Sequence, residues 1–151
     1  MGLRTSESVV VNAPPSRVFP YVSALDEYPS WLPLVHTAWL EQPDQTPAWM
    51  VEIRAHVGPF ARSKRLRMVR TVHEIDRLVE FERVELDGRR HARWLLRVEL
   101  APDAESATLV TMDLAYDGSL WTAGVLDRVL AEEVRRGRDG LAALINDAPT
   151  H

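Results

Sequence analysis

The chain has 151 residues, of which 46% are hydrophobic and 26% are charged, and it contains no cysteine. This size and composition are typical of a globular protein, and we expect one domain over residues 1–151. The 18 basic and 22 acidic side chains are interleaved and give a net charge of −4, which argues against binding to nucleic acid. Without cysteine, disulfides, thiol nucleophiles and cysteine-ligated zinc are excluded.

No run approaches the ~20 apolar residues of a membrane-spanning helix, and the N-terminus lacks the apolar core of a secretion signal. We therefore expect a soluble protein without stable membrane insertion. A cytoplasmic location is expected as well, because a chain without cysteine suits a reducing compartment.

The front of the chain is predicted to form a strand and two short helices. Ser6–Asn12 is rich in β-branched residues and ends before two prolines, which is typical of a strand. Ser16–Ala24 has apolar residues at steps of three and four, which predicts an amphipathic helix. Glu27–Leu32 is predicted to be a second short helix, with Asp26 as its cap and Pro33 as its end.

Six further stretches are predicted to be strands, because turn residues separate them and they are rich in β-branched and aromatic residues. They are Leu34–Gln42, Trp49–Val57, Arg62–His73, Leu78–Glu85, His91–Leu100 and Thr108–Tyr116. Asp87-Gly88 is the clearest hairpin signal among the connections.

Apolar and polar residues alternate along these strands, so each strand has one apolar face. Pairing successive strands as hairpins brings the apolar faces together in two neighbouring rows. The first row is Trp49, Arg70, Phe81, Trp94 and Leu114, and the second is Val51, Met68, Arg83, Ala92 and Tyr116.

Leu120–Asn146 is predicted to be a long helix with one apolar stripe. The stripe consists of Ala123, Leu126, Leu130, Val134, Gly137, Leu141 and Leu144. Such a stripe must pack on a large apolar surface, and the strands supply one. We predict an α+β fold in which this helix packs on a curved antiparallel sheet of about seven strands, with a ligand space between them. Gly137 admits a close neighbour, leaves room for the ligand, or has no such role.

The order of these elements and the motifs at the front of the chain resemble the START/polyketide-cyclase-like superfamily (SRPBCC). The motifs are Ala13-Pro14-Pro15, Val18-Phe19 and Tyr28-Pro29-Ser30-Trp31-Leu32-Pro33, and the last is similar to the start of the coenzyme-Q-binding branch. The resemblance extends from about Ser6 to Asn146. It implies the helix-grip fold, with a deep and mostly apolar cavity between the sheet and the last helix. Members of this superfamily include carriers, aromatase/cyclases and other functions.

A bent sheet and a straight helix leave a gap that large side chains or a ligand must fill. The aromatic walls suit a polycyclic, isoprenoid or aryl ligand, although the same rings would also fill an ordinary core. The residues predicted to line the ligand are Trp49, Val51, Met68, Phe81, Trp94, Met112, Leu114, Tyr116 and Leu130. Tyr28, Trp31 and Leu34 are predicted to form a gate.

Arg70 and Arg83 fall on the predicted inner face, where an unpaired charge is costly. They are therefore candidates to bind an acidic headgroup of the ligand. One alternative is an internal partner, for which Glu133 is the candidate. The other is that both arginines lie near strand ends and reach water.

Motifs for catalysis and cofactors are sparse. The histidines lack metal-ligand spacing, so we predict no metal or other cofactor, and His36 alone is considered for proton transfer. The sequence has no Gly-x-Ser-x-Gly motif and no Gly-rich phosphate loop. The aromatase/cyclase branch uses an arginine early in the fourth strand. The nearest residue here is Lys64, which weakens the interpretation as an enzyme.

We therefore favour binding or transport of a hydrophobic small molecule, such as a lipid, an isoprenoid, a quinone or a polyketide-like compound. The first alternative is a polyketide cyclase, aromatase or dehydratase, for which no catalytic residues are assigned. The second is a non-catalytic protein-interaction module, which an exposed apolar patch would favour.

Overall fold

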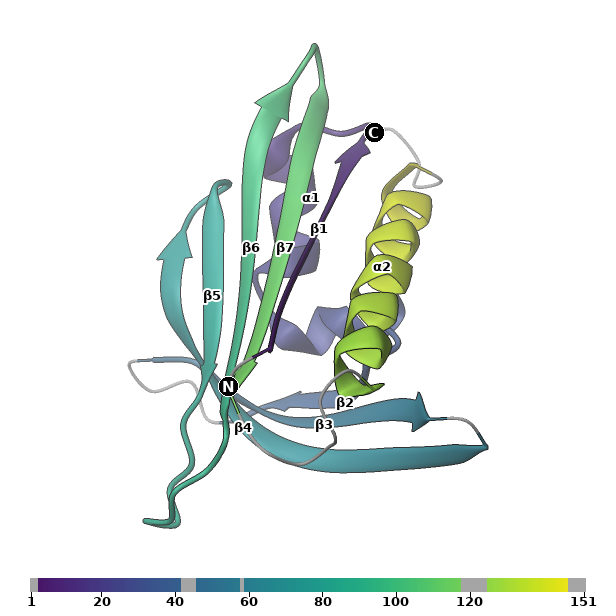
Figure 1. The fold of residues 1–151 in the computed structure, drawn as a ribbon. Helices are drawn as coiled ribbons and strands as arrows, with labels where there is room; N and C mark the ends of the chain where they lie inside the picture. The colour runs from purple at the N-terminus through teal and green to yellow at the C-terminus, as the bar shows by residue number, and fades with distance from the viewer. Residues whose placement is uncertain (1–2, 42–45, 58, 118–124, 147–151) are drawn as a thin grey trace.

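The computed structural model describes residues 3–41, 46–57, 59–117 and 125–146. The elements within these ranges are shown in Figure 1. In chain order they are β1 (Leu3–Val11), α1 (Pro15–Val22), η1 (Leu25–Ser30, a 3-10 helix), β2 (Val35–Leu40), β3 (Ala48–Val57), β4 (Phe60–Glu74), β5 (Leu78–Arg83), β6 (Arg93–Asp103), β7 (Ala107–Asp117) and α2 (Val125–Asn146). The predicted beginning of the last helix, residues 120–124, lies outside the described residues.

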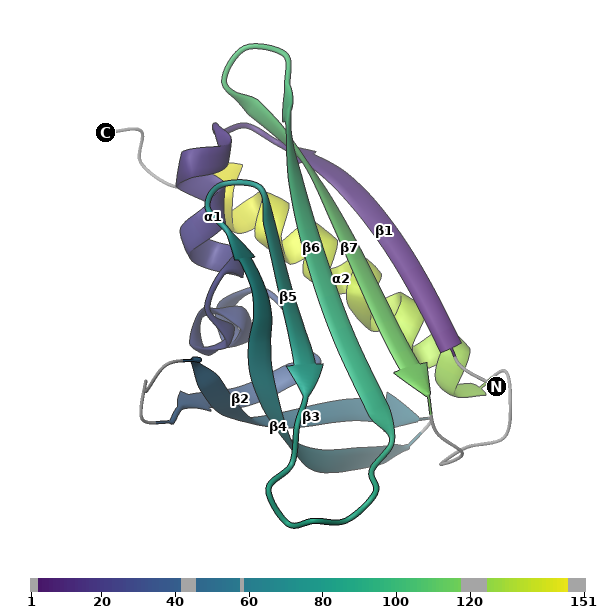
Figure 2. The same ribbon diagram turned by 90° about the vertical axis from the view of Figure 1, so that its left-hand side faces the viewer.

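The strands form one antiparallel sheet in the order β1-β7-β6-β5-β4-β3-β2. The sheet bends strongly, so that β2, β3 and part of β4 lie beneath α2 while β1 and β5–β7 stand beside it (Figure 1). An irregular pairing between Arg70 and Val72 in β4 contributes to this bend. Figure 2 shows α2 crossing the concave side of β6 and β7, with α1 beside it. The predicted α+β helix-grip fold is confirmed.

The concave face of the sheet, one stripe of α2 and the buried side chains of α1 and η1 form the hydrophobic core. Along β6 and β7, buried residues alternate with more exposed ones, as the sequence pattern predicts. From α2 the core receives Leu130, Val134, Gly137 and Leu141. None of the helices in the described part of the chain is long and apolar enough to cross a membrane.

The predicted register is wrong in three of the four hairpins that build the two rows. The observed pairs are Trp49–Met68, Phe81–Leu96 and Trp94–Tyr116, in place of Trp49–Arg70, Phe81–Trp94 and Trp94–Leu114. Between β4 and β5 the prediction is correct, because Arg70 does pair with Phe81. Each error amounts to two residues. Such a shift keeps every side chain on its own face, so apolar alternation does not detect it.

The residues that follow η1 lie directly against α2. A methyl group at Gly137 would overlap the Cδ1 atom of Leu32, and one at Gly140 would overlap the carbonyl oxygen of Trp31. The two glycines therefore permit a close approach between the helix and this part of the chain. Of the alternatives for Gly137, the structure shows the close neighbour.

Candidate functional site

An apolar cavity of about 40 Å³ lies between the concave face of the sheet, η1 and α2. Its lining side chains are Leu25, Leu32, Leu34, Val35, Val51, Ile53, Leu66, Met68, Trp94, Leu96, Leu114 and Val134. These residues come from η1 and the segment after it, from five strands and from α2. The cavity is therefore the place where the layers of the fold meet.

Part of the predicted site is found in this lining. The residues concerned are Val51, Met68, Trp94, Leu114 and the predicted gate residue Leu34. The predicted site did not include Ile53, Leu66, Leu96 and Val134, although the strand and helix patterns place them on apolar faces. It also missed Leu25, Leu32 and Val35. They belong to or follow a short helix, and a segment of this length has too few repeats to indicate which side faces the sheet.

Three other aromatic residues of the predicted site pack on one another beside the cavity. The ring of Phe81 meets Trp49 and Tyr28 edge-on, with centroids 5.5 and 5.9 Å apart. Trp49 Nε1 donates a hydrogen bond to Asp26 Oδ1, and Tyr28 Oη donates one to the carbonyl oxygen of Val22, each at 2.7 Å. These rings fill the core, with their polar atoms satisfied.

The remaining members of the predicted set are buried outside the cavity lining. Trp31 is 3% exposed, and its Nε1 donates to the carbonyl oxygen of Tyr21 at 3.0 Å, which joins η1 to α1. Met112 and Leu130 are core residues that are absent from the cavity's lining.

Arg70 attaches the loop between α1 and η1 to the sheet. Its Nη1 donates to the carbonyl oxygen of Ser23 at 2.7 Å, and its Cζ lies 5.6 Å from the centroid of the Trp49 ring. Both contacts favour the charged guanidinium. Burial lowers the pKa of Arg70. The group is thus engaged with protein atoms and does not line the described cavity.

Arg83 is also engaged with protein atoms. Its side chain is 5% exposed, and its Nε donates to Glu85 Oε2 at 2.6 Å while its Nη1 donates to the carbonyl oxygen of Ala92 at 3.2 Å. The prediction of Glu133 as an internal partner is wrong, since Glu133 lies 3.5 Å from Arg136 on its own helix. Glu85 is two residues after Arg83, so the predicted strand Leu78–Glu85 places the two side chains on one face, but the sequence analysis did not consider this pair.

Three buried side-chain polar atoms have no hydrogen-bond partner within the described residues. One is Thr37 Oγ1 on β2, and the other two are Trp94 Nε1, on a residue that lines the cavity, and Tyr116 Oη. The two residues are direct neighbours across β6 and β7, with ring centroids 4.6 Å apart. Most buried polar groups in proteins are hydrogen-bonded, so this pair is an exception.

Lys64 lies on the same concave face. It pairs across β3 and β4 with Ile53, which lines the cavity, and residues paired in this way share a face. Burial lowers the pKa of Lys64, and the charge of Arg83 lowers it further, while Glu85 opposes this change. The concave face thus carries positive charge beside the apolar cavity.

A second pocket, of about 230 Å³, is polar and lies between α2 and His56 of β3. Its lining consists of His56, Arg128, Val129, Glu132, Glu133 and Arg136. The Glu133 side chain is 6% exposed. Burial raises its pKa, although the charges of Arg136 and His56 oppose this rise. No cluster of metal-ligating side chains occurs in the described ranges, and His36 is exposed on β2.

The family described as polyketide cyclase / dehydrase and lipid transport matches residues 3–146 of the chain. No curated protein matches the chain.

Several solved structures share the fold. A START superfamily protein from Mycobacterium smegmatis is 15% identical, with a TM-score of 0.75 over 94% of this chain and 96% of that one. A protein from Thermus thermophilus is 17% identical, with a TM-score of 0.76 over 97% and 99% of the two chains. The Zhui aromatase/cyclase from Streptomyces sp. R1128 is 10% identical, with a TM-score of 0.73 over 96% and 94%. At these identities the likeness shows the fold alone.

Proposed function

Because this chain belongs to the polyketide cyclase/dehydrase and lipid transport family, we propose that it binds or transports a hydrophobic small molecule between the curved sheet, η1 and α2. The observation that carries this proposal is the cavity at the centre of the fold, whose lining side chains are aliphatic residues, one methionine and one tryptophan. Such walls favour a guest that gains free energy by leaving water.

The volume of the cavity is too small for the proposed ligands unless the protein changes shape. About 40 Å³ is far less than the roughly 150 Å³ of an engineered protein cavity that binds benzene. A lipid, isoprenoid, quinone or polyketide-like guest therefore requires the cavity to widen. The α1–η1 segment is the proposed gate, because it carries Leu25 of the lining and is joined to the sheet through Arg70 and Trp49.

A cyclase, aromatase or dehydratase is the alternative function within the same family. Such an enzyme needs a positioned acid or base next to its substrate. Lys64, which shares the concave face with the lining residue Ile53, is the first residue to test for this role. Conversion of a linear polyketone by the wild type, and loss of that conversion in Lys64→Met, would favour the enzyme.

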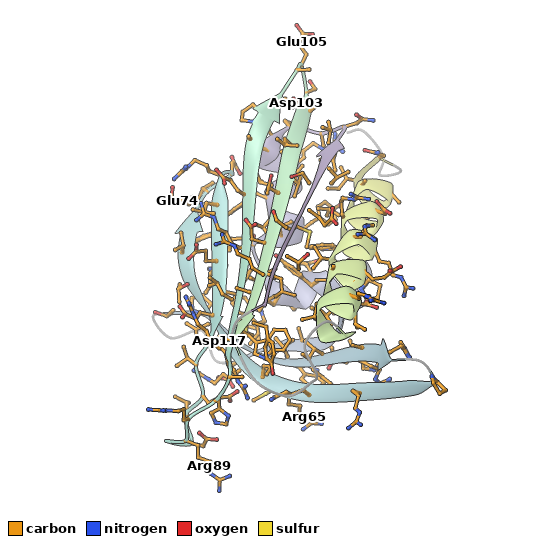
Figure 3. The ribbon with its side chains drawn as sticks, in the orientation of Figure 1. Arg65, Glu74, Arg89, Asp103, Glu105 and Asp117 are labelled. Carbon is orange, nitrogen blue, oxygen red and sulfur yellow. The ribbon has the colours of Figure 1, made fainter. Side chains whose placement is uncertain are left out.

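The proposed partner is a small molecule and not a nucleic acid. On the outer side of the sheet Arg67 pairs with Glu41 and Arg93 with Glu82. Arg65 points away from α2 on the same side (Figure 3) and lies 3.7 Å from a carboxylate oxygen of Glu52. Paired charges of this kind attract phosphate backbones weakly. A cytoplasmic location is part of the proposal, since it suits a chain without cysteine.

Native mass spectrometry of the protein purified from its own host tests the proposed function. We expect a retained small molecule in the wild type and its loss in Val51→Phe, which fills the cavity. Val10→Phe is the matched control, because Val10 is 45% exposed on β1. Circular dichroism establishes that both variants fold. Retention of the molecule by Val51→Phe, or failure of the wild type to bind any lipid, isoprenoid or quinone, would contradict the proposal.

A further inference from the structure

The unpaired atoms of Trp94 and Tyr116 set these residues apart from the other buried aromatic residues with polar atoms. Trp31 Nε1, Trp49 Nε1 and Tyr28 Oη each have a hydrogen-bond acceptor at 3.0 Å or less. Trp94 and Tyr116 are 4% and 3% exposed, yet Trp94 Nε1 and Tyr116 Oη have no partner among the described residues. An unpaired buried donor lowers stability, so its presence calls for a functional explanation.

The chemistry of the two groups defines what would satisfy them. An indole N–H only donates hydrogen bonds, and a phenol hydroxyl donates as well as accepts. Both groups can therefore donate, and they belong to residues that pair across β6 and β7 and whose rings are in contact. The complementary group is an acceptor, such as the oxygen of a ketone or a carboxylate.

The surroundings favour the same kind of group. Trp94 lines the apolar cavity, so an acceptor beside it would be attached to an apolar body. Lys64 and Arg83 lie on the concave face, where Lys64 pairs with Ile53 and Arg83 pairs with Met68. Arg83 is occupied by Glu85, which leaves the ammonium group of Lys64, on the same concave face, as a source of attraction for a negative charge.

We propose that the hydrophobic molecule bound by this chain carries a ketone or carboxylate oxygen, and that Trp94 Nε1 and the Tyr116 hydroxyl donate hydrogen bonds to that oxygen. This inference rests on the proposed function and specifies the ligand of the same site. The sequence analysis named Arg70 and Arg83 as the groups that bind the polar end of the ligand, but their donors are engaged with protein atoms. The inference assigns this role to Trp94 and Tyr116 instead.

The first test uses the protein without a ligand. Tyr116→Phe removes a hydroxyl that has no partner among the described residues, so its melting temperature is expected to equal or exceed that of the wild type. Tyr28→Phe is the matched control, because its hydroxyl donates to the carbonyl oxygen of Val22 at 2.7 Å, and a lower melting temperature is expected. A decrease in Tyr116→Phe as large as that in Tyr28→Phe would overturn the inference, since it would show that the Tyr116 hydroxyl is already satisfied.

The second test compares three probes of equal chain length, namely dodecane, 2-dodecanone and dodecanoate, in competition with a fluorescent fatty acid. The wild type is expected to bind the ketone and the carboxylate at least about fivefold more tightly than the alkane. Tyr116→Phe is expected to remove most of this preference without changing the affinity for dodecane. Lys64→Met is expected to weaken dodecanoate but not 2-dodecanone, which distinguishes the carboxylate from the ketone.

Two negative results have different meanings. Equal affinity of the wild type for dodecane and the two oxygen-containing probes would overturn the inference and leave the proposed function in place. Absence of binding by all three probes would overturn both.

Discussion

Replacement of Gly140 by alanine tests whether the chain after η1 lies directly on α2. A methyl group at this position would overlap the carbonyl oxygen of Trp31, well inside the 3.4 Å at which ordinary contact begins. This oxygen belongs to the backbone, so no side-chain rotation removes the overlap. The helix and the chain at Trp31 must instead separate by about 1 Å.

Two opposing effects determine the change in the free energy of unfolding. Alanine in place of glycine stabilises a helix by about 0.5–1 kcal/mol. Overpacking costs roughly 1–3 kcal/mol, and an overlap with backbone belongs in the upper part of that range. We therefore expect Gly140→Ala to lose about 1–2 kcal/mol, which lowers the melting temperature of a domain of this size by about 2–8 °C.

Gly137→Ala is the matched control on the same helix. Its methyl group would meet the Cδ1 atom of Leu32, which is the end of a flexible side chain and can change rotamer. We expect its melting temperature to stay within about 3 °C of the wild type. Thermal and urea unfolding followed by circular dichroism measure both variants. A Gly140→Ala protein as stable as Gly137→Ala would refute the close contact of Trp31 with α2.

Three further predictions concern other buried groups. Because burial raises the pKa of Glu133 in the folded state, its contribution to stability is complete below its ordinary value of 4.5 and is lost as the pH rises through the raised pKa. Glu133→Gln should therefore gain stability relative to the wild type as the pH increases across this range, and a pH-independent difference would contradict this. Thr108→Val loses a buried hydrogen bond of 2.7 Å to the carbonyl oxygen of Ala13, and chemical denaturation should show a loss of about 1–3 kcal/mol. Thr111→Val removes an exposed hydroxyl and is the control, so its free energy of unfolding should change by less than about 0.5 kcal/mol. An equal loss of stability in Thr108→Val and Thr111→Val would contradict the buried hydrogen bond of Thr108. Arg70→Met releases the loop between α1 and η1, so stopped-flow fluorescence should show faster entry of a hydrophobic probe, and an unchanged rate would argue against the gate.

The sequence predicted which side of the five strands β3 to β7 faces the core. Val51, Met68, Trp94 and Leu114 were assigned to the inner face, and the structure places all four in the cavity lining. This success has a simple cause, because side chains of a strand alternate with a period of two residues. Register was predicted less well, since a shift of two residues leaves that alternation unchanged.

The hydrogen-bond partners of the two arginines on the concave face were not predicted from the alternation of apolar and polar residues. Their position on the concave face was predicted, but Arg70 meets the carbonyl oxygen of Ser23 and Arg83 meets Glu85. Both partners lie in irregular segments, whose paths depend on how the short helices and the loop after β5 pack on the sheet. Glu133 was the candidate for an internal partner, because a helix stripe can be read from the sequence and the path of a loop cannot.

By itself, the sequence determined an α+β fold with a long helix on an antiparallel sheet, the inner faces and the apolar character of the interior, because the periodicities of the segments carry this information locally. The resemblance of the front motifs to a known superfamily added the helix-grip arrangement. Only the tertiary structure decided how much space remains and which polar atoms are satisfied. Tyr28 and Tyr116 are both buried tyrosines, yet only the hydroxyl of Tyr28 meets an acceptor within the described chain. That difference arises from the meeting of segments distant in sequence, so no local pattern encodes it.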